Sequence, residues 1–135
     1  MITTKGRYAL RVMLDLAEQG SDGKKIPLKD TAERQGISKK YLEIIVKELV
    51  AGKLLKGASG KNGGYSLLRK PEEYTVGEIL ELMEGTLSSV ACLADPDYQC
   101  PRADACCTLP MWSEFDAMVR DFFFSRTLAD LLQNK

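Results

Sequence analysis

Apolar residues near the start of the chain recur at every third or fourth position, which is the spacing of an amphipathic helix. This pattern predicts a helix over residues 3–19, with Thr3 or Thr4 as its N-terminal cap and Gly20 at its end. The polar stretch 21–25 then predicts a loop.

Two shorter helices follow, predicted at about 28–35 and at 39–51. Gly36 and Ile37 predict a tight turn between them, and Ser38 is a favourable N-cap for the second helix. A helix, a short turn with glycine and a capped helix make a helix-turn-helix pattern. The second helix is therefore predicted to be a recognition helix, which such proteins place in the major groove of DNA.

The outer face of this predicted recognition helix is polar and mostly basic. A carboxylate is unusual there, because phosphates repel it unless it accepts a hydrogen bond from a cytosine amino group. Glu43 therefore has two interpretations, namely discrimination between bases or an ion pair with Lys39 or Lys47 one turn away. The predicted DNA-facing residues of this helix are Ser38, Lys39, Lys40, Tyr41, Glu43 and Lys47.

A glycine-rich, basic hairpin is predicted directly after the recognition helix. Its first strand begins at Leu54 and its second contains Tyr65. A hairpin in this position is a wing, and the Gly-Lys-Ser/Thr order of nucleotide-binding loops is missing from it. The predicted DNA contacts of the wing are Ser59, Gly60, Lys61 and Gly63.

The C-terminal part contains three more predicted helices. Thr75 caps a helix over 76–84, and Thr127 caps a short last helix. Between them lies a long helix, about 110–124, with Pro110 in its first turn and apolar side chains over more than half of its circumference. A second copy of this helix could cover the apolar surface in a two-fold dimer, or the first helix of the same chain could cover it, and we expect both to contribute.

These elements predict a mainly α fold with a small β wing, that is, a winged helix-turn-helix DNA-binding domain plus a long C-terminal dimerisation helix. Residues 1–75 are expected to form the DNA-binding head. Residues 76–135 are expected to hold a linker helix, a cysteine loop at 90–108 and the dimerisation helix. We expect the whole chain to form one compact unit.

Charge divides the chain into two parts, although its formal net charge is zero. Residues 1–70 carry 15 Lys and Arg against 7 Asp and Glu, whereas residues 71–135 carry 4 against 12. A basic head is typical of a protein that binds a polyanion. No stretch approaches the ~18 apolar residues of a membrane span and the start lacks a secretory signal, so we expect a cytoplasmic protein, in which persistent disulfides are rare.

All of the cysteines lie in one short polar segment, and the chain has no histidine. Clustered thiolates suit zinc or an iron–sulfur cluster, and they also act as redox switches. The spacing lacks the Cys-x-x-Cys pairs of zinc ribbons and of thioredoxin-type centres. A cluster or metal ligand set, a thiol switch and incidental thiols are therefore the open explanations. The cysteines are Cys92, Cys100, Cys106 and Cys107.

An enzyme is not indicated, because the chain has no histidine base and no recognisable nucleophile–base pair. A protein-interaction adaptor that uses the winged helix for partners is a third class of function. Binding that survives high salt would point to such an adaptor, since phosphate-dominated binding weakens steeply with salt.

Three blocks of sequence together resemble the Rrf-two family of bacterial transcription regulators. They are MITTKGRYALRVMLDLA at the start, PLKDTAERQGISKKYLEIIVKEL (27–49) and the wing sequence KNGGYSL (61–67). Within the family, the chain is most similar to the iron–sulfur cluster regulators of the IscR type. The shared features are ERQGIS, YLE and a three-cysteine loop before a helix that carries a tryptophan.

The resemblance implies a homodimer that binds double-stranded DNA, and a dimer is expected to bind a palindromic operator. It implies that Ser38, Lys40, Tyr41 and Glu43 lie at the recognition surface, and that the wing at 59–64 reaches the DNA backbone or minor groove. It also implies an iron–sulfur cluster, [2Fe–2S] in preference to [4Fe–4S], which can be absent from the purified protein. The implied cluster ligands are Cys92, Cys100 and Cys106.

This chain departs from the family pattern at three places. The relatives have a histidine as fourth ligand where this chain has Leu109, so that Cys107, an Asp of the loop or of the partner subunit, or an outside thiol become the candidates. The spacing from Cys92 to Cys100 is also wider than in the relatives. In the wing, Ser59 stands where the relatives usually carry Arg, and Lys61 can replace that Arg as a phosphate contact.

A cysteine loop between a DNA-binding head and a dimer helix predicts a sensor. Our hypothesis is that cluster binding orders residues 92–107, shifts the long helix and changes how the two heads meet DNA. The alternative is a cluster-free regulator of cysteine or sulfur metabolism in the same family. It would act through its thiols or through contact with a metabolic enzyme.

Overall fold

The computed structural model describes residues 2–20, 23–61 and 63–134. The head consists of three helices and an antiparallel two-stranded hairpin, as the sequence predicts. Its elements are α1 (Thr4–Gln19), α2 (Leu28–Gln35), α3 (Lys39–Ala51), β1 (Leu55–Ala58) and β2 (Gly64–Leu67).

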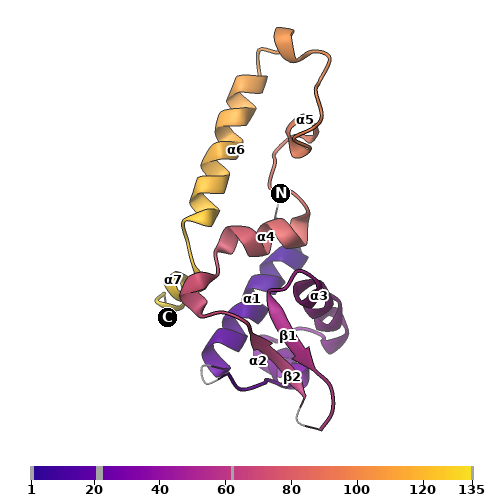
Figure 1. The fold of residues 1–135 in the computed structure, drawn as a ribbon, viewed down its shortest axis with the longest axis vertical. Helices are drawn as coiled ribbons and strands as arrows, with labels where there is room; N and C mark the ends of the chain where they lie inside the picture. The colour runs from indigo at the N-terminus through magenta and orange to yellow at the C-terminus, as the bar shows by residue number, and fades with distance from the viewer. Residues whose placement is uncertain (1, 21–22, 62, 135) are drawn as a thin grey trace.

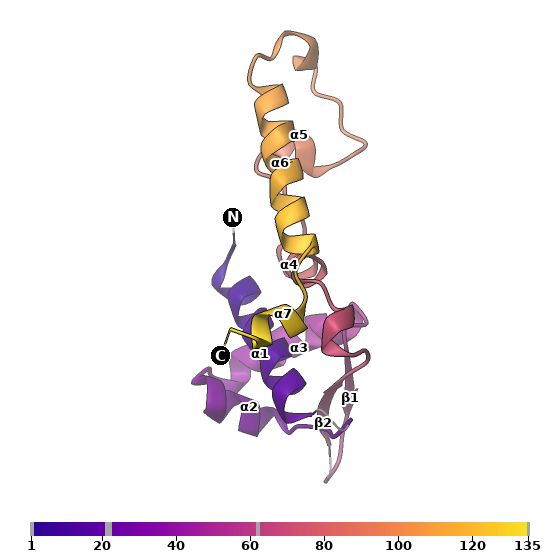
Figure 2. The same cartoon turned by 90° about the vertical axis from the view of Figure 1, so that its left-hand side faces the viewer.

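The second half of the chain extends away from the head (Figures 1 and 2). Helix α6 rises from the head, and the cysteine segment lies at its far end, whereas the tip of the wing points to the opposite end of the molecule. The elements of this half are η1 (Pro71–Glu73), α4 (Val76–Glu84), α5 (Ala91–Ala94), η2 (Ala103–Ala105), α6 (Leu109–Phe124) and α7 (Leu128–Leu132).

The core of the head forms between the predicted apolar faces of α1 and α3. Met13 of α1 and Leu42 and Ile45 of α3 are completely buried. The predicted caps fix where the helices begin, because the Thr3 hydroxyl accepts a hydrogen bond from Gly6 N at 3.2 Å. Ser38 accepts one from Tyr41 N at 3.1 Å in the same way. Pattern and capping chemistry therefore agree on the placement of the recognition helix.

A buried carboxylate, Asp15, holds α2 against α1. Arg34 donates to both of its oxygens, at 2.8 and 2.9 Å, and the Thr31 hydroxyl donates at 3.0 Å. Burial by itself raises the pKa of Asp15, but the hydrogen bonds from Arg34, Thr31 and Gln35 outweigh it and hold the pKa below its usual value. The orientation of the helix-turn-helix unit thus depends on an ionised group inside the head.

Helix α6 packs mainly on α4 and less on the first helix than the sequence suggested. A Cβ atom on Gly77 of α4 would overlap the ring of Phe124, and Arg120 forms an ion pair with Glu81. Among the described residues, α1 contributes Leu10 alone to the small apolar cluster that Phe123 and Phe124 form with Val76 and Leu80 of α4. No residue of α6 is buried, and none of the helices in the described ranges is both long and apolar enough to cross a membrane.

Candidate nucleic-acid interface and cysteine loop

A hollow of about 460 Å³ lies between the exposed face of α3 and the wing. Such a concave strip beside a recognition helix can accommodate the edge of a DNA groove. Two predicted residues of α3, Glu43 and Lys47, and one of the wing, Ser59, border it. Its lining consists of Glu43, Lys47, Val50, Gly57, Ala58, Ser59 and Tyr65.

The predicted DNA-facing residues of α3 divide into exposed and half-buried ones. Lys39, Lys40, Glu43 and Lys47 are exposed, whereas the Tyr41 ring is half-buried against Tyr8, with 5.8 Å between ring centroids. Within the described residues, Glu43 makes no ion pair, so the expected alternative pairing with Lys39 or Lys47 is absent. The Glu43 carboxylate is therefore available to a hydrogen-bond donor outside the chain.

The wing presents its predicted contact residues at the tip. Ser59, Gly60 and Lys61 are exposed, and Gly63 N donates to Gly60 O at 3.0 Å to close the turn. Gly60 has φ +105, a backbone conformation that side chains disfavour, which explains a glycine at this position. The structure therefore places the four predicted wing residues in one turn.

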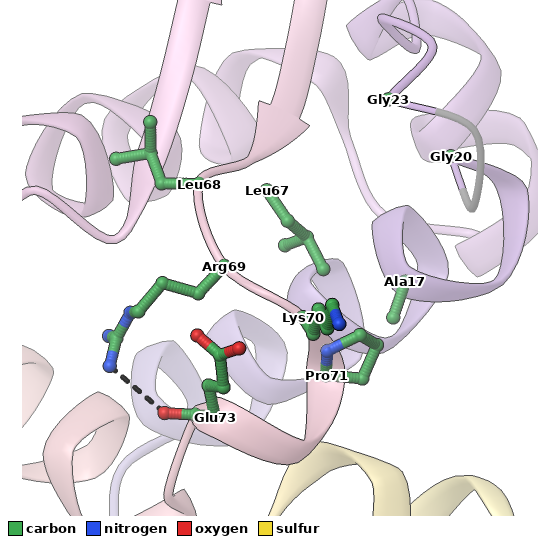
Figure 3. A pocket seen from close by; sticks show the side chains of 9 residues that line it. All are labelled: Ala17, Gly20, Gly23, Leu67, Leu68, Arg69, Lys70, Pro71 and Glu73. Carbon is green, nitrogen blue, oxygen red and sulfur yellow. Dashed lines mark hydrogen bonds between the residues drawn. The ribbon is translucent and has the colours of Figure 1, made fainter.

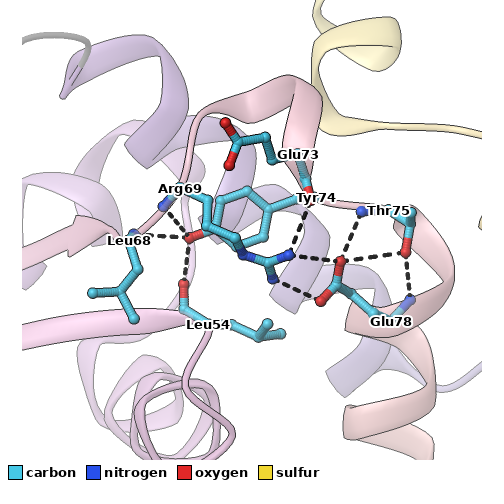
Figure 4. A network of polar contacts seen from close by, with 7 residues as sticks. All are labelled: Leu54, Leu68, Arg69, Glu73, Tyr74, Thr75 and Glu78. Carbon is cyan, nitrogen blue, oxygen red and sulfur yellow. Dashed lines mark hydrogen bonds and ion pairs between the residues drawn. The ribbon is translucent and has the colours of Figure 1, made fainter.

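The base of the wing is tied to α4 by a buried tyrosine and an ion pair (Figure 4). The Tyr74 hydroxyl donates to Leu54 O and accepts from Leu68 N, both at 2.8 Å. Arg69 lies over the Tyr74 ring at 4.2 Å and pairs with Glu78, with 2.6 Å between Nη2 and Oε1. Both ends of the hairpin are thus fixed to the first turn of α4.

Glu78 also caps α4, because it accepts a hydrogen bond from Thr75 N at 3.0 Å while Thr75 accepts one from Glu78 N at 3.1 Å. Burial alone raises the pKa of Glu78, but the hydrogen bonds from Arg69 and Thr75 lower it below its usual value. The start of α4 also contacts the segment that follows α6, since Val76 N donates to Arg126 O at 2.8 Å. The wing, α4 and the end of α6 therefore meet in one network.

A second hollow, of about 440 Å³, lies where the end of α1 meets the wing base (Figure 3). Leu67 and Pro71 contribute apolar surface to it, and Lys70 and Glu73 border it. Arg69 turns its guanidinium toward the Glu73 carbonyl, to which Nη1 donates at 3.0 Å. The guanidinium therefore belongs to the polar contacts at the base of the wing that Figure 4 shows, here called the wing-base network.

The cysteine segment encloses a separate hollow of about 440 Å³. Two of the predicted ligands, Cys92 and Cys100, border it together with Leu109, the residue at the position of the family's histidine. Asp104 is the one carboxylate of its lining. The complete lining is Cys92, Leu93, Tyr98, Gln99, Cys100, Ala103, Asp104 and Leu109.

The third predicted ligand, Cys106, does not belong to the lining of this hollow in the described structure and lies against Thr108 instead. Its Sγ lies 3.4 Å from the Thr108 hydroxyl. Hydrogen bonds from the Thr108 side chain and from the backbone of Thr108 and Leu109 lower the pKa of this thiol. The neighbouring Cys107 is exposed. The surroundings of Cys106 therefore favour the reactive thiolate form of this side chain.

The predicted ligand set does not fit an iron–sulfur cluster in this conformation. In residues 2–20, 23–61 and 63–134, no group of three Cys, Asp or Glu side chains is placed to hold a metal ion. A cluster needs four ligands. Cys106 would have to leave Thr108 and turn toward Cys92 and Cys100 for three thiolates to meet.

The start of the cysteine segment is attached to α6 by Asp116. Its Oδ1 accepts hydrogen bonds from Ser89 N at 2.9 Å and from Ser89 Oγ at 2.6 Å. Asp116 Oδ2 is buried and has no hydrogen-bond partner within the described part of the chain. Because Ser89 lies three residues before Cys92, this contact joins α6 to the start of the cysteine segment.

The chain matches the family of Rrf2 iron-dependent transcriptional regulators over residues 2–134. It belongs to the Rrf2 family. It is 35% identical over 133 residues to protein rrf2 of Nitratidesulfovibrio vulgaris, covering 98% of this chain and 87% of the relative. It is 34% identical to the HTH-type transcriptional regulator IscR of Pectobacterium atrosepticum, covering 99% of this chain and 80% of that protein.

The structure of CymR, the global cysteine regulator of B. subtilis, is also similar, with a TM-score of 0.79 and 32% identity. The match covers 100% of this chain and 98% of that one. The family match, the relatives and the similar structure all indicate a winged-helix transcription regulator that binds DNA and is not an enzyme. They confirm the predicted fold, the predicted family and the predicted class of function. This Rrf2-family chain is thus related both to IscR and to the cysteine regulator CymR.

Two features of this Rrf2-family protein were missed by the reasoning from sequence. The wing-base network joins Leu54, Arg69 and Glu78, whose proximity follows only from the fold. The contact between Asp116 and Ser89 spans 27 positions of the chain. Neither has a local sequence signal, although Thr75 followed by Glu78 is a recognisable capping box.

Proposed function

We propose that this Rrf2-family protein is a homodimeric transcription regulator of the cytoplasm whose cysteine loop senses iron–sulfur cluster or redox status. One observation carries the proposal. Helix α3 and the wing, which carry exposed lysines, lie at one end of the molecule, and the cysteine segment lies at the other end, beside α6. Helix α6 is hydrogen-bonded to Ser89, before the cysteine segment, through Asp116, and Arg126, which follows α6, accepts a hydrogen bond from Val76 N at the start of α4.

DNA recognition in this proposal uses α3 and the wing. Lys39, Lys40, Lys47 and Lys61 contact phosphates, which gives affinity without sequence preference. Glu43 accepts a hydrogen bond from a cytosine amino group and so discriminates between bases. The support for this role is that the Glu43 carboxylate is exposed and makes no ion pair in the described structure. Ser38, Tyr41, Ser59, Gly60 and Gly63 complete the proposed DNA-facing surface.

The partner in the proposed dimer is a second copy of α6. Its side chains Met111, Phe115, Met118 and Phe122 are between 36% and 64% exposed and follow the spacing of one helix face. A continuous apolar stripe of this kind is costly to leave in water. Two copies of the stripe packed together form an isologous interface, and the resulting two-fold symmetry calls for a palindromic operator.

The proposed sensor is the cysteine segment, with Cys92, Cys100 and Cys106 as ligands. The similarity to IscR supports this ligand role, and Asp104 is our candidate for the fourth ligand because it borders the same hollow as Cys92 and Cys100. Cys107 is the alternative fourth ligand. A cluster, when bound, would supply a labile reporter of iron and oxidant supply. The protein's own contribution is to move Cys106 away from Thr108.

A second candidate is a cluster-free regulator of cysteine or sulfur metabolism that responds through its thiols or through a metabolic enzyme. The observation that favours it is the separation of Cys106 from the hollow of Cys92 and Cys100, together with the lowered pKa of Cys106. The similarity to the cysteine regulator CymR also supports it. The nature of the signal distinguishes the two candidates, whereas DNA binding is common to both.

Anaerobic purification tests the sensor. We expect visible absorbance, with iron and sulfide in equal amounts, and we expect Cys92→Ser, Cys100→Ser and Cys106→Ser each to abolish it. Cys107→Ser is the matched control and should retain the absorbance if Asp104 is the fourth ligand. A colourless protein whose DNA affinity instead follows thiol oxidation would replace the cluster with the thiol mechanism. DNA affinity that responds to neither treatment would remove the sensor role altogether.

A further inference from the structure

Three lysines border a hollow of about 540 Å³ beside the tip of the wing. Lys61 belongs to the wing, but Lys24 and Lys25 belong to the segment between α1 and α2, far away in the sequence. The lining is Gly23, Lys24, Lys25, Pro27, Asp30, Lys61 and Gly63. Lys24 and Lys25 are not among the DNA-facing residues that the recognition-helix and wing patterns indicate.

Backbone pairing brings this segment to the wing. Ile26 is 5% exposed and forms an isolated antiparallel bridge with Tyr65, whose other edge pairs with Gly57 of β1. Ile26 N donates to Tyr65 O and Tyr65 N donates to Ile26 O, both at 2.9 Å. A Cβ atom on Gly64 would overlap the Ile26 carbonyl, so glycine permits the close approach. Lys24 and Lys25 are thus placed by the wing itself.

Within the described residues, no ion pair neutralises the lysines around this hollow. Lys24, Lys25 and Lys61 are exposed, and none of them forms an ion pair in the part of the chain that the structure describes. Asp30 is the one carboxylate of the lining, and it makes no ion pair in these ranges either. Three ammonium groups around one hollow attract a group with negative charge, and lysine binds phosphate as a point charge.

The position of these three lysines indicates which phosphates of a bound DNA they would contact. They lie on the side of β2 that faces away from β1, whereas the hollow with Glu43 lies between α3 and the wing. Figures 1 and 2 show the strands of the wing and the start of α2 in the part of the molecule remote from the cysteine loop. DNA that reaches the wing tip and continues outward passes this side of β2.

We propose that Lys24, Lys25 and Lys61 form a phosphate-binding site for the DNA backbone outside the bases read by α3. The inference rests on the proposed DNA-binding function and extends its footprint. Contacts of this kind position the duplex and carry no base preference. Each lysine that neutralises a phosphate releases condensed counterions, so its contribution is visible in the salt dependence of binding.

The test compares two duplexes and three full-length proteins. A palindromic site is first selected from random duplexes with the wild type. The short duplex ends at the outermost selected base pairs, and the long one adds about one helical turn on each side. The proteins are the wild type, the variant Lys24→Gln/Lys25→Gln and the matched control Lys70→Gln, which removes one exposed lysine at the opposite end of the hairpin. Kd is measured for each pair over a series of salt concentrations.

We expect the double variant to lose affinity for the long duplex only, and its log–log salt slope there to fall by about 1 for each lost lysine contact. On the short duplex it should match the wild type, and Lys70→Gln should match the wild type on both. Equal behaviour of the double variant and the wild type on the long duplex would overturn the site. Equal weakening on both duplexes would also overturn it. A wild type that enriches no duplex in the selection step would instead refute the proposed DNA-binding function.

Discussion

Arg69 and Glu78 form a paired contact between the base of the wing and the first turn of α4, with 2.6 Å between Arg69 Nη2 and Glu78 Oε1. Arg69 follows the second strand of the wing, and Glu78 is part of the capping box of α4. The angle of the wing relative to α4, and through α4 to α6, is therefore set by side chains outside the proposed DNA-facing surface.

Replacement of Glu78 with Gln should loosen the wing without unfolding the head. The amide oxygen can still accept the hydrogen bond from Thr75, but the charge that attracts Arg69 is lost. Because the pair is partly exposed, we expect a loss of only about 1 kcal/mol in the free energy of unfolding. Hydrogen exchange of the amides of β1 and β2 should become faster. Glu81→Gln, which breaks the pair with Arg120 in the same helix, is the control and should leave wing exchange unchanged. If the amides of β1 and β2 exchanged as slowly in Glu78→Gln as in the wild type, Glu78 would have no role in positioning the wing.

Acid should weaken the head through Asp15. Its pKa is depressed in the folded state, so its stabilising contribution is complete above the ordinary carboxyl pKa and is lost as the pH falls toward the lower folded value. Asp15→Asn should cost about 2 kcal/mol at neutral pH and make the acid side of the stability profile less steep. Chemical denaturation at a series of pH values measures both effects. Glu33→Gln removes an exposed carboxylate of α2 and is the control, which should change neither the stability at neutral pH nor its dependence on acid. If the stability of Asp15→Asn fell with acid as steeply as that of the wild type, this explanation would be refuted.

The repeating pattern of apolar residues and the capping residues were sufficient to predict the head. Thr3, Ser38 and Thr75 cap the helices where expected, because capping is a local interaction. The wing was predicted for a similar reason, since glycine and β-branched or aromatic residues mark turns and strands. The first strand begins one residue later than predicted, because Leu54 precedes β1, and β2 contains the predicted Tyr65.

The relations between distant segments could not be predicted from local pattern. Ile26 pairs with Tyr65, and Ser89 binds Asp116, through the fold as a whole. The packing of α6 on α4 depends on the absence of a side chain at Gly77, and a single glycine in a helix has no such meaning in the sequence alone. The cysteine segment was expected to be irregular, and the short turns α5 and η2 within it have no periodic pattern to reveal them. The ligand roles of Cys92, Cys100 and Cys106 stay a prediction.

Glu43→Ala should relax the base preference of the protein. If Glu43 accepts a hydrogen bond from a cytosine amino group, its removal should reduce discrimination at that position by about 1–3 kcal/mol. Selection from a library of duplexes, followed by Kd measurements on the selected and the substituted sites, gives this number. Lys47→Ala is the control on the same face and should weaken all sites alike, with a salt slope lower by about 1. Uniform weakening by Glu43→Ala would show that its carboxylate does not read a base.

Met118→Glu should convert the proposed dimer into a monomer. Met118 is 64% exposed in the middle of the apolar stripe of α6, so two copies of the variant would bring like charges together in the interface. Ser113→Glu adds the same charge on the other side of the helix and should leave the dimer intact. Sedimentation equilibrium measures the mass of each form. A Met118→Glu protein that stays dimeric, or a wild type that is monomeric, would contradict the α6 interface.

The most direct test of a regulator that links its cysteine loop to DNA is the operator affinity of one preparation in two states. The selected palindromic duplex is titrated anaerobically with protein reconstituted with iron and sulfide, and with the same protein reduced and free of metal. We predict Kd values that differ by about 5- to 150-fold, the usual range for coupling between two sites. The Cys106→Ser variant should give one value under both treatments. Tight binding with equal Kd values for the two states of the wild type would leave a DNA-binding protein without this sensor, and would contradict the account.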